Sequence, residues 1–396
     1  MALSKIDIEN MVTGETPVAN GGTGQTTLAA AGLQRPLSKP LIYNGNMEMS
    51  RRGTSTTGLT NGDGGYHTVD RWRWHENGSS SSVWTMTQES LSSGNAYADG
   101  FHKALKLDCT TAHSSIGTGD TLAIEHRLEK DDLSAFKKGT ANALGFTFGF
   151  WVKATKTGTN VVEIQDQTND RTISGTYTIS SSDTWEHKIV SFGPDTTGNF
   201  GTGDALGLII RFYLYAGTEY TSGGLQTSWG AATTTKRATG QVNNADSTSN
   251  NWHLTGVQLE VGEFTSSTIP DFQHETYGDN LARCQRYYLR YQGDSSDQRS
   301  IGDGFFNDGS NIRATVNFPV TMRAPGTITE SDLVSLWQGG SSEAISLTAT
   351  IDPTTNAVLA SVSADSGSPY SSYVGQGVNI RTSDTNDGFF AVDAEL

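Results

Sequence analysis

The chain has 396 residues, of which 35% are hydrophobic and 17% are charged, and both fractions are low for a globular protein. Its formal net charge is −15, so it lacks the excess of Lys and Arg that binding to nucleic-acid phosphates requires. The acidic balance favours solubility, and it would repel an anionic glycan unless a local basic patch intervenes.

Chain length and small-residue content indicate more than one β-rich core. The length exceeds that of one ordinary core, and 45 of the residues are glycine. Abundant glycine, serine and threonine suit many short strands joined by tight polar turns. No stretch approaches the roughly 20 apolar residues of a membrane span, and the N-terminal residues lack the apolar segment of a signal peptide. We therefore expect a soluble protein made in a cytosol.

Cysteine usage is sparse, with only Cys109 and Cys284. Two cysteines do not form a disulfide framework, and the sequence alone does not decide whether they pair. Because free cysteine is often buried, two buried thiols are expected.

Residues 1–40 have the composition of a connecting arm rather than of a domain. They hold few large apolar residues, and Pro36 and Pro40 close the segment. Such a segment is expected to be extended and to become ordered on a partner. Its weak apolar set is far too short for a coiled coil and comprises Ile6, Ile8, Met11 and Val12.

The glycine-rich stretch VANGGTGQTTLAAAGL, residues 18–33, superficially resembles a nucleotide-binding loop. A phosphate-binding loop requires G-x-x-x-x-G-K-[ST] between a buried strand and a helix. With Gly24 as the second glycine, the first would fall at Ala19, and the lysine is replaced by the uncharged Gln25. Nucleotide binding is therefore not expected.

From residue 41 to about 270, apolar residues recur at every second position, which is the pattern of half-buried strands. In ALKLDC one face carries Leu105, Leu107 and Cys109, and FTFGFWVK and LIIRFYLY alternate in the same way. In NWHLTGVQLEVG the alternation slips at Thr255 and Gly256, which predicts a β-bulge. No convincing helix of ten or more residues appears, so an antiparallel β-sandwich is predicted.

The polar-aromatic face of LIIRFYLY is a candidate sugar-binding surface. If Phe212 faces the core, Arg211, Tyr213 and Tyr215 share the opposite face. Sugars present C–H patches that stack on aromatic rings, and nearby polar groups fix their hydroxyls. The alternative is that loop residues or a partner chain cover this face.

Residues 271–396 are predicted to form a second, smaller β-sandwich. LARCQRYYLRYQ is expected to begin it with a short helical turn that leads into a strand, and IRATVNFPV, ISLTATI and FFAVDAEL alternate as strands. The connecting segment, residues 262–280, holds few apolar residues and one proline, as a linker does.

No catalytic or metal-binding pattern stands out. The eight histidines are scattered without an H-E-x-x-H motif. The oxygen-rich turns TNGDGG, FNDGSN and TNDG lack the ligand spacing of a calcium loop, and ordinary Asx turns explain them. We expect no enzymatic activity and no cofactor.

Several motifs, in order along the chain, resemble those of bacteriophage tail-fibre and tail appendage proteins. PVANGGTGQTT resembles a motif near the N-termini of many tail fibres, and YNGNMEMSRRG with TVDRW resembles the opening of their carbohydrate-binding-module-like jelly roll. LTGVQLEVGEFTS and DFQHETYGDNLARCQRYY resemble the end of that domain and the start of the next. VNFPVTMRAPGT and VDAEL resemble landmarks of the C-terminal sandwich. Between about residues 75 and 245 no motif matches.

The resemblance implies a tail protein of the virion, made in the host cytoplasm, usually homotrimeric and tethered by its N-terminus. It implies a virion-anchoring arm at 1–40, a jelly-roll β-sandwich at 41–270 and a C-terminal β-sandwich at 271–396. Glycine lets an extended arm pack closely against partner chains, and a flexible spacer is the alternative. The implied attachment residues are the apolar set above together with Asn20, Gly21, Gly22, Thr23 and Gly24.

The segment DRWRWHEN takes its roles from the same resemblance. Trp72 is expected in the core, and Asp70 and Arg71 are expected in structural pairs. Trp74 is a further glycan-binding candidate. A structural calcium ion in the jelly roll is compatible with the resemblance, but no ligands can be assigned to it.

The predicted function is a tail fibre that binds host-surface glycan through its β-sandwich domains, with no nucleic-acid partner and no membrane insertion. A purely structural fibre, or a capsid or tail decoration protein that binds only other virion proteins, is the alternative. A short depolymerase would require a cleft with two opposed carboxylates. A glycan-sized cleft with exposed aromatic rings would favour the adhesin.

Overall fold

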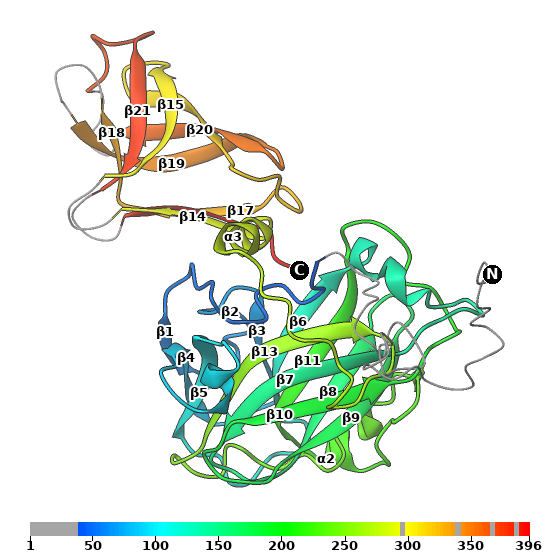
Figure 1. Cartoon of the computed structure of the whole chain (residues 1–396). Coiled ribbons are helices and arrows are strands. Elements are labelled where there is room, and N and C mark those ends of the chain that lie inside the picture. Colours follow the sequence, from blue (N-terminus) through cyan, green and yellow to red (C-terminus); the bar gives the residue numbers. More distant parts are fainter. Residues whose placement is uncertain (1–38, 294–297, 337–341, 365–368, 384–387) are drawn as a thin grey trace, which may run out of the picture.

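The computed structural model describes residues 39–293, 298–336, 342–364, 369–383 and 388–396. Two β-rich units follow one another along the chain, with a short helix between them (Figure 1). The predicted attachment residues of the arm, Ile6 to Gly24, lie outside the described residues.

The first unit is a sandwich of two antiparallel sheets. The spatial order of the six-stranded sheet is β1 (Ser55–Leu59), β4 (Val83–Ser90), β5 (Lys103–Thr111), β13 (Asn251–Val261), β7 (Phe146–Ala154) and β10 (Glu186–Phe192). The order of the seven-stranded sheet is β12 (Gly230–Ala231), β9 (Arg171–Ile179), β8 (Gly158–Asp166), β11 (Leu206–Ala216), β6 (Thr121–Glu129), β3 (Trp72–Asn77) and β2 (Gly65–Tyr66).

Alternation along the strands builds the core between these sheets. Phe146, Phe148 and Phe150 of β7 are buried in one cluster with Leu208, Ile210 and Phe212 of β11. The same cluster contains Leu105, Leu107 and Cys109 of β5, as their spacing predicts. Cys109 and Cys284 are both buried and free, as expected.

The register shifts in several strand pairs, and two of these shifts lie beside candidate site residues. The pairing of β13 with β7 shifts register between Thr255 and Gln258, and Gly256 there has φ 61°. This confirms the predicted bulge, since a left-handed backbone suits glycine. A second shift, in the pairing of β11 with β6, lies between Tyr213 and Tyr215 and was not predicted.

Helices are short throughout the described chain. The first unit carries α1 (Asn95–Ala98), α2 (Thr218–Thr221) and the 3₁₀ turns Asp131–Phe136 and Thr234–Lys236. The helix α3 (Tyr277–Gln285) begins the second unit with Thr276 as its N-cap, since the Asp279 N–H donates to the Thr276 hydroxyl. No helix among these residues is long and apolar enough to cross a membrane.

The second unit is a barrel beside a small sheet. β14 (Tyr288–Gln292), β22 (Phe389–Asp393) and β17 (Thr327–Ser331) form the three-stranded sheet. The closed barrel has the order β15 (Ser300–Phe306), β16 (Asn311–Asn317), β20 (Ala357–Ala364), β19 (Ser342–Pro353), β18 (Leu333–Leu336) and β21 (Gly377–Thr382).

The all-β class with β-sandwich architecture is confirmed by these sheets. The C-terminal unit differs in one respect from the expected sandwich, because six of its strands close on themselves. Because the barrel is closed, none of these strands has an unpaired edge. Alternation within each strand does not show which strands pair, so the sequence did not predict the closure. The domain boundary after residue 270 stays a prediction.

Residues 393–396 return to the first unit and tie the two units together (Figure 1). The carboxylate of Glu395 accepts from the guanidinium of Arg71 and lies 3.4 Å from that of Arg52. Arg127 Nη1 donates to the carbonyl of Leu396 over 2.8 Å. Arg71 is fully buried, so this contact places a paired charge inside the junction.

Candidate functional site

The four residues expected to contact glycan are all buried. Tyr215 and Trp74 have no exposed surface, Tyr213 is 2% exposed and Arg211 is 7% exposed. Stacking on a sugar requires an open ring face, so the expectation that these residues form an exposed surface is wrong.

Arg211 and Tyr213 belong to a buried ionic network beneath a long loop. Arg211 Nε lies 2.7 Å from Glu125 Oε1, and its Nη1 lies 2.9 Å from Glu163 Oε1. Tyr213 donates its hydroxyl to Glu163 Oε2 over 3.0 Å, and Arg237 of the covering loop pairs with the same carboxylate. Loop residues therefore cover this face, which is the alternative that the sequence left open.

Tyr215 and Trp74 lie in the core of the sandwich instead. The bulge between Tyr213 and Tyr215 turns Tyr215 inward, where its hydroxyl contacts Glu76 and Ser82. Trp74 packs edge to face with Trp84, their ring centroids 6.3 Å apart. A single bulge thus separated two tyrosines that strict alternation would place together.

The neighbouring residues of DRWRWHEN take structural positions, as expected. Trp72 is fully buried in the core. Asp70 Oδ1 lies 3.7 Å from Arg52 Nη1, and Arg71 pairs with Glu395. Burial raises the pKa of the Asp70 carboxyl to about 6, and Arg52 opposes this shift.

An aromatic cleft of about 590 Å³ lies instead on the outer face of the six-stranded sheet. It is bordered by β7, β10 and β13, by the end of α1 and by the segment that follows β13. The side chains that line this aromatic cleft include those of Asp99, Phe101, Trp151, His187, Gln258, Phe272 and His274.

Trp151 and His187 form one wall of the aromatic cleft. They are directly opposed on β7 and β10, and their rings are stacked with centroids 5.1 Å apart and an interplanar angle of 26°. The Trp151 indole N–H donates to Asp99 Oδ2 over 2.9 Å. Trp151 also packs on the buried cluster of Ala96, Ala104 and Trp185, so its half-exposed ring is held in place.

The bulge in β13 shapes the floor. A Cβ on Gly256 would lie 2.7 Å from the ring of Phe101, so only glycine lets this ring approach the strand. Gln258, just past the bulge, donates its amide N–H to the carbonyl of Pro270 over 3.1 Å. This bond fastens the segment that carries Phe272 and His274 across the sheet.

Phe101, Phe272 and His274 form the opposite wall. Phe101 and Phe272 pack edge to face at 4.9 Å, and His274 lies 4.8 Å from Phe272. A second hollow of about 300 Å³ shares His274 with the aromatic cleft, and His102 and Tyr277 also line it. His274 therefore borders both hollows.

The polar groups of the cleft include the imidazole of His187, the amide of Gln258 and the carboxylate of Asp99. Burial lowers the pKa of His187, and the nearby Asp99 carboxylate opposes this shift. His187 is therefore uncharged at neutral pH and carries one donor and one acceptor nitrogen. The half-buried rings of Trp151 and Phe272, with polar groups beside them, suit a sugar, which has apolar C–H faces and hydroxyl rims.

An oxygen-rich cage elsewhere in the sandwich is filled by a lysine. Lys138 Nζ lies 2.6 Å from Asp166 Oδ2 and 3.0 Å from Asp195 Oδ2, and it donates to the carbonyls of Thr197 and Gly198. The ammonium thus supplies the positive charge that a cation would bring there. No group of three or more His, Cys, Asp or Glu side chains with metal-binding geometry occurs in the described parts of the chain.

One of the three oxygen-rich turns is an Asx turn, as expected, because Asp308 Oδ1 accepts from the N–H groups of Ser310 and Asn311. In TNGDGG, Asp63 Oδ2 instead accepts from the N–H of Thr60, three residues earlier, over 2.7 Å. Most of the third turn, TNDG, lies outside the described residues.

Sequence reasoning missed the aromatic cleft, although one of its residues carried a signal. Alternation in FTFGFWVK places Trp151 opposite the buried phenylalanines, on the outer face of β7. An outward tryptophan on a strand is a binding-site signal. His187 and the Phe272 segment come from distant parts of the chain, and no spacing rule joins them to Trp151.

Comparison with known proteins gives only distant likenesses. No family model matches the sequence, and the search of curated proteins finds no match. The enzymatically active domain of tailspike protein 4 of bacteriophage CBA120 is 14% identical, with a TM-score of 0.27 over 52% of this chain and 21% of that chain. The present chain thus aligns with about a fifth of that tailspike structure.

Two carbohydrate-binding modules are comparably distant. TmCBM61 in complex with β-1,4-galactotriose is 8% identical, with a TM-score of 0.28 over 57% of this chain and 99% of that one. The family 11 module of a Clostridium thermocellum cellulosomal cellulase is 10% identical, with a TM-score of 0.26 over 53% and 98%. At such scores these likenesses carry no argument about function.

Proposed function

We propose that this protein is a non-enzymatic, carbohydrate-binding appendage of a bacteriophage tail, and that its aromatic cleft binds host-surface glycan. The N-terminal arm attaches it to other tail proteins of the virion, and the assembled form is a homotrimer. The sequence motifs that resemble tail fibres motivate the virion location, the arm and the trimer.

The observation that carries the glycan assignment is the Trp151–His187 wall with its Asp99 contact. The rings are stacked, and the indole is fixed by a hydrogen bond, so little side-chain entropy is lost when a sugar binds. The cleft of about 590 Å³ has a second hollow of about 300 Å³ beside it, which shares His274. We propose that a glycan chain of more than one sugar unit occupies these hollows.

The test is binding of the full chain to intact host cells, with and without removal of surface polysaccharide. We expect saturable binding that is lost on removal, and about fivefold to tenfold weaker binding by Trp151→Ala, because one stacking contact is worth about 1–1.4 kcal/mol. Phe305→Ala is the matched control, since Phe305 is an exposed aromatic residue on the barrel outside the cleft.

The alternative outcomes are distinct. Absence of binding by a folded, assembled protein would favour a purely structural fibre or decoration protein. Binding unaffected by Trp151→Ala would remove the aromatic cleft from the proposal. Shortening of the polysaccharide by the purified protein would contradict the non-enzymatic role.

A further inference from the structure

Apart from histidines, the ionisable side chains around the aromatic cleft and the second hollow are acidic. Asp99 and Asp271 line the cleft. Glu48 and Glu275 line the hollow of about 300 Å³ beside it. Among the described residues, neither space is lined by a Lys or an Arg. A ligand that occupies them therefore meets aromatic rings, imidazoles and carboxylates.

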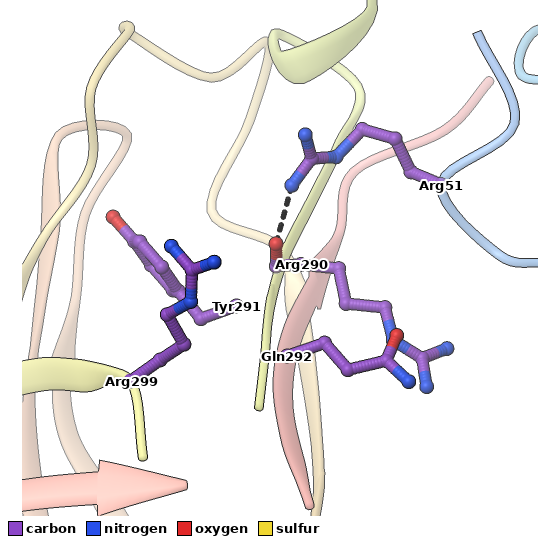
Figure 2. A pocket seen from close by; sticks show the side chains of 5 residues that line it. All are labelled: Arg51, Arg290, Tyr291, Gln292 and Arg299. Atoms are coloured by element: carbon purple, nitrogen blue, oxygen red, sulfur yellow. Dashed lines mark hydrogen bonds between the residues drawn. The ribbon is translucent and has the colours of Figure 1, made fainter. Parts of the chain in front are cut away.

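Other hollows of the molecule have the opposite character. At the junction of the two units, a hollow of about 360 Å³ is lined by Arg51, Arg290 and Arg299, and Figure 2 shows Arg51 donating to the backbone carbonyl of Arg290. Three lysine side chains line a hollow of about 190 Å³ beside the 3₁₀ turn Asp131–Phe136. The acidic lining is therefore a local property of the cleft and its neighbour, and the formal net charge of −15 does not by itself explain it.

Two of the lining carboxylates have no cationic partner in the described parts of the chain. Asp99 Oδ2 accepts the indole N–H of Trp151 over 2.9 Å, but Asp99 forms no ion pair with those residues. The half-buried side chain of Glu48 forms neither an ion pair nor a hydrogen bond with them. Glu275, in contrast, pairs with Arg283. A partly desolvated carboxylate without a counter-charge costs free energy, so a bound cation would be stabilised here.

A lysine on the outer face of β7 is already paired. Lys153 follows Trp151 by two residues, so both side chains point to the same face of the sheet. Lys153 Nζ lies 3.4 Å from Asp183 Oδ1 and 5.6 Å from the ring centroid of Trp185. The charge of this lysine is thus engaged outside the cleft, and the cation that Asp99 lacks would come from a ligand.

We propose that these two hollows bind a glycan that carries free amino groups, and that Asp99 and Glu48 accept its ammonium groups. This inference rests on the proposed function, because it names the class of sugar for the same site. Ammonium groups are attracted to carboxylates and to aromatic ring faces, and Trp151 and Phe272 line the same cleft as Asp99. A glycan of uronic acids would instead be repelled. Simple diamines share the ammonium chemistry but lack the sugar ring.

The experiment is isothermal titration of the full chain at neutral pH and low salt with a glucosamine tetrasaccharide, its fully N-acetylated counterpart and the diamine cadaverine. We expect the glucosamine tetrasaccharide to bind about fivefold more tightly than the N-acetylated one. Asp99→Asn and Glu48→Gln should each weaken its binding by about threefold to fivefold, because each removes one ion pair near the surface. The loss should be smaller for the N-acetylated ligand, which carries no ammonium group.

Two features keep this comparison clean. Asp99→Asn retains an oxygen that can accept the Trp151 N–H, so it removes charge without removing the acceptor. Glu219→Gln is the matched control, because Glu219 is exposed and lines neither hollow. The melting temperature of each variant verifies that it is folded, and Glu48→Gln carries the test where Asp99→Asn is unfolded.

Each outcome decides the proposal. Tighter binding of the glucosamine tetrasaccharide that the two variants weaken and the control preserves supports it. Equal or tighter binding of the N-acetylated ligand overturns the preference for amines and still agrees with a glycan site. Cadaverine binding as tight as that of the tetrasaccharide overturns the assignment to a sugar. Absence of binding by all three ligands overturns this inference, and the host-cell experiment then decides the proposed function separately.

Discussion

The role of an outward-facing aromatic side chain in this protein depends on whether other residues cover it. Tyr213 and Trp151 are both aromatic residues on strand faces turned away from the core phenylalanines. A loop that carries Arg237 covers Tyr213, whereas Trp151 stays half-exposed beside His187. Burial therefore makes the first residue structural and leaves the second available for a ligand.

Replacement of Tyr213 tests this distinction at the residue scale. Tyr213→Phe keeps the ring and removes the hydrogen bond to the buried Glu163 carboxylate. We expect the free energy of unfolding to fall by about 1.5–3 kcal/mol, because the bond involves a charged group. Denaturant titration measures this change, and glycan binding should not change. A loss of glycan binding by the folded variant would reopen the buried face as a binding surface.

The titration of His75 also belongs to this scale. Burial lowers its pKa to about 4, and Arg211 acts in the same direction, while Glu125 opposes it. Between roughly pH 6.5 and 4 the unfolded chain binds a proton at this position that the folded protein does not, so His75 makes stability fall as pH falls.

The variant His75→Gln lacks the imidazole, so it cannot bind a proton at this position in either the folded or the unfolded state. The free energy of unfolding of the wild type should therefore decline more steeply than that of the variant, by up to about 1.4 kcal/mol per pH unit between pH 6 and 5. Urea titrations at a series of pH values measure both slopes. Parallel slopes would show that His75 is protonated equally in the folded and unfolded states.

At the element scale, bulges decide which face each side chain occupies. The bulge in β13 brings Phe101 against Gly256 and shapes the floor of the aromatic cleft. The bulge in β11 sends Tyr215 into the core. Each bulge shifts the two-residue period by one and thereby exchanges the faces beyond it.

Gly256→Ala tests the bulge in β13. Alanine at position 256 would have to adopt a left-handed backbone with φ 61°. Its Cβ would also lie 2.7 Å from the ring of Phe101. We expect a loss of about 2 kcal/mol in the free energy of unfolding and weaker glycan binding. Gly224→Ala is the matched control, since a Cβ there meets nothing within 4 Å. Equal stability of the two variants would refute the strain at Gly256.

At the scale of the whole molecule, the segment 393–396 joins the two units through buried charge. Arg71 lies 3.4 Å from the ring centroid of Tyr287 and pairs with Glu395, while Arg52 lies 3.6 Å from the ring centroid of Tyr288. The guanidinium groups of the first unit thus make cation–π contacts with aromatic rings of the second unit.

Glu395→Gln tests the coupling of the units. It leaves the fully buried Arg71 without its charge partner, so we expect a loss of about 3–5 kcal/mol in the free energy of unfolding. Glu219→Gln, at an exposed position, is the control. Calorimetry should show destabilisation in the first variant only. An unchanged melting temperature for Glu395→Gln would mean that the junction does not contribute to stability.

The sequence alone determined the fold class and much of the core. Alternation in ALKLDC and FTFGFWVK fixes which residues are buried, since a strand exposes its two faces in turn. The slip at Gly256 likewise predicts the bulge, because glycine tolerates the left-handed backbone that a bulge requires. These properties depend on residues that are neighbours in the sequence, so the sequence pattern is enough to predict them.

Only the tertiary structure decided which aromatic face is open. The loop of Arg237 covers Tyr213, and the Phe272 segment walls in Trp151, through contacts between residues far apart in the chain. Burial and charge pairing depend on which distant segments meet, and a pattern of neighbouring residues carries no information on that.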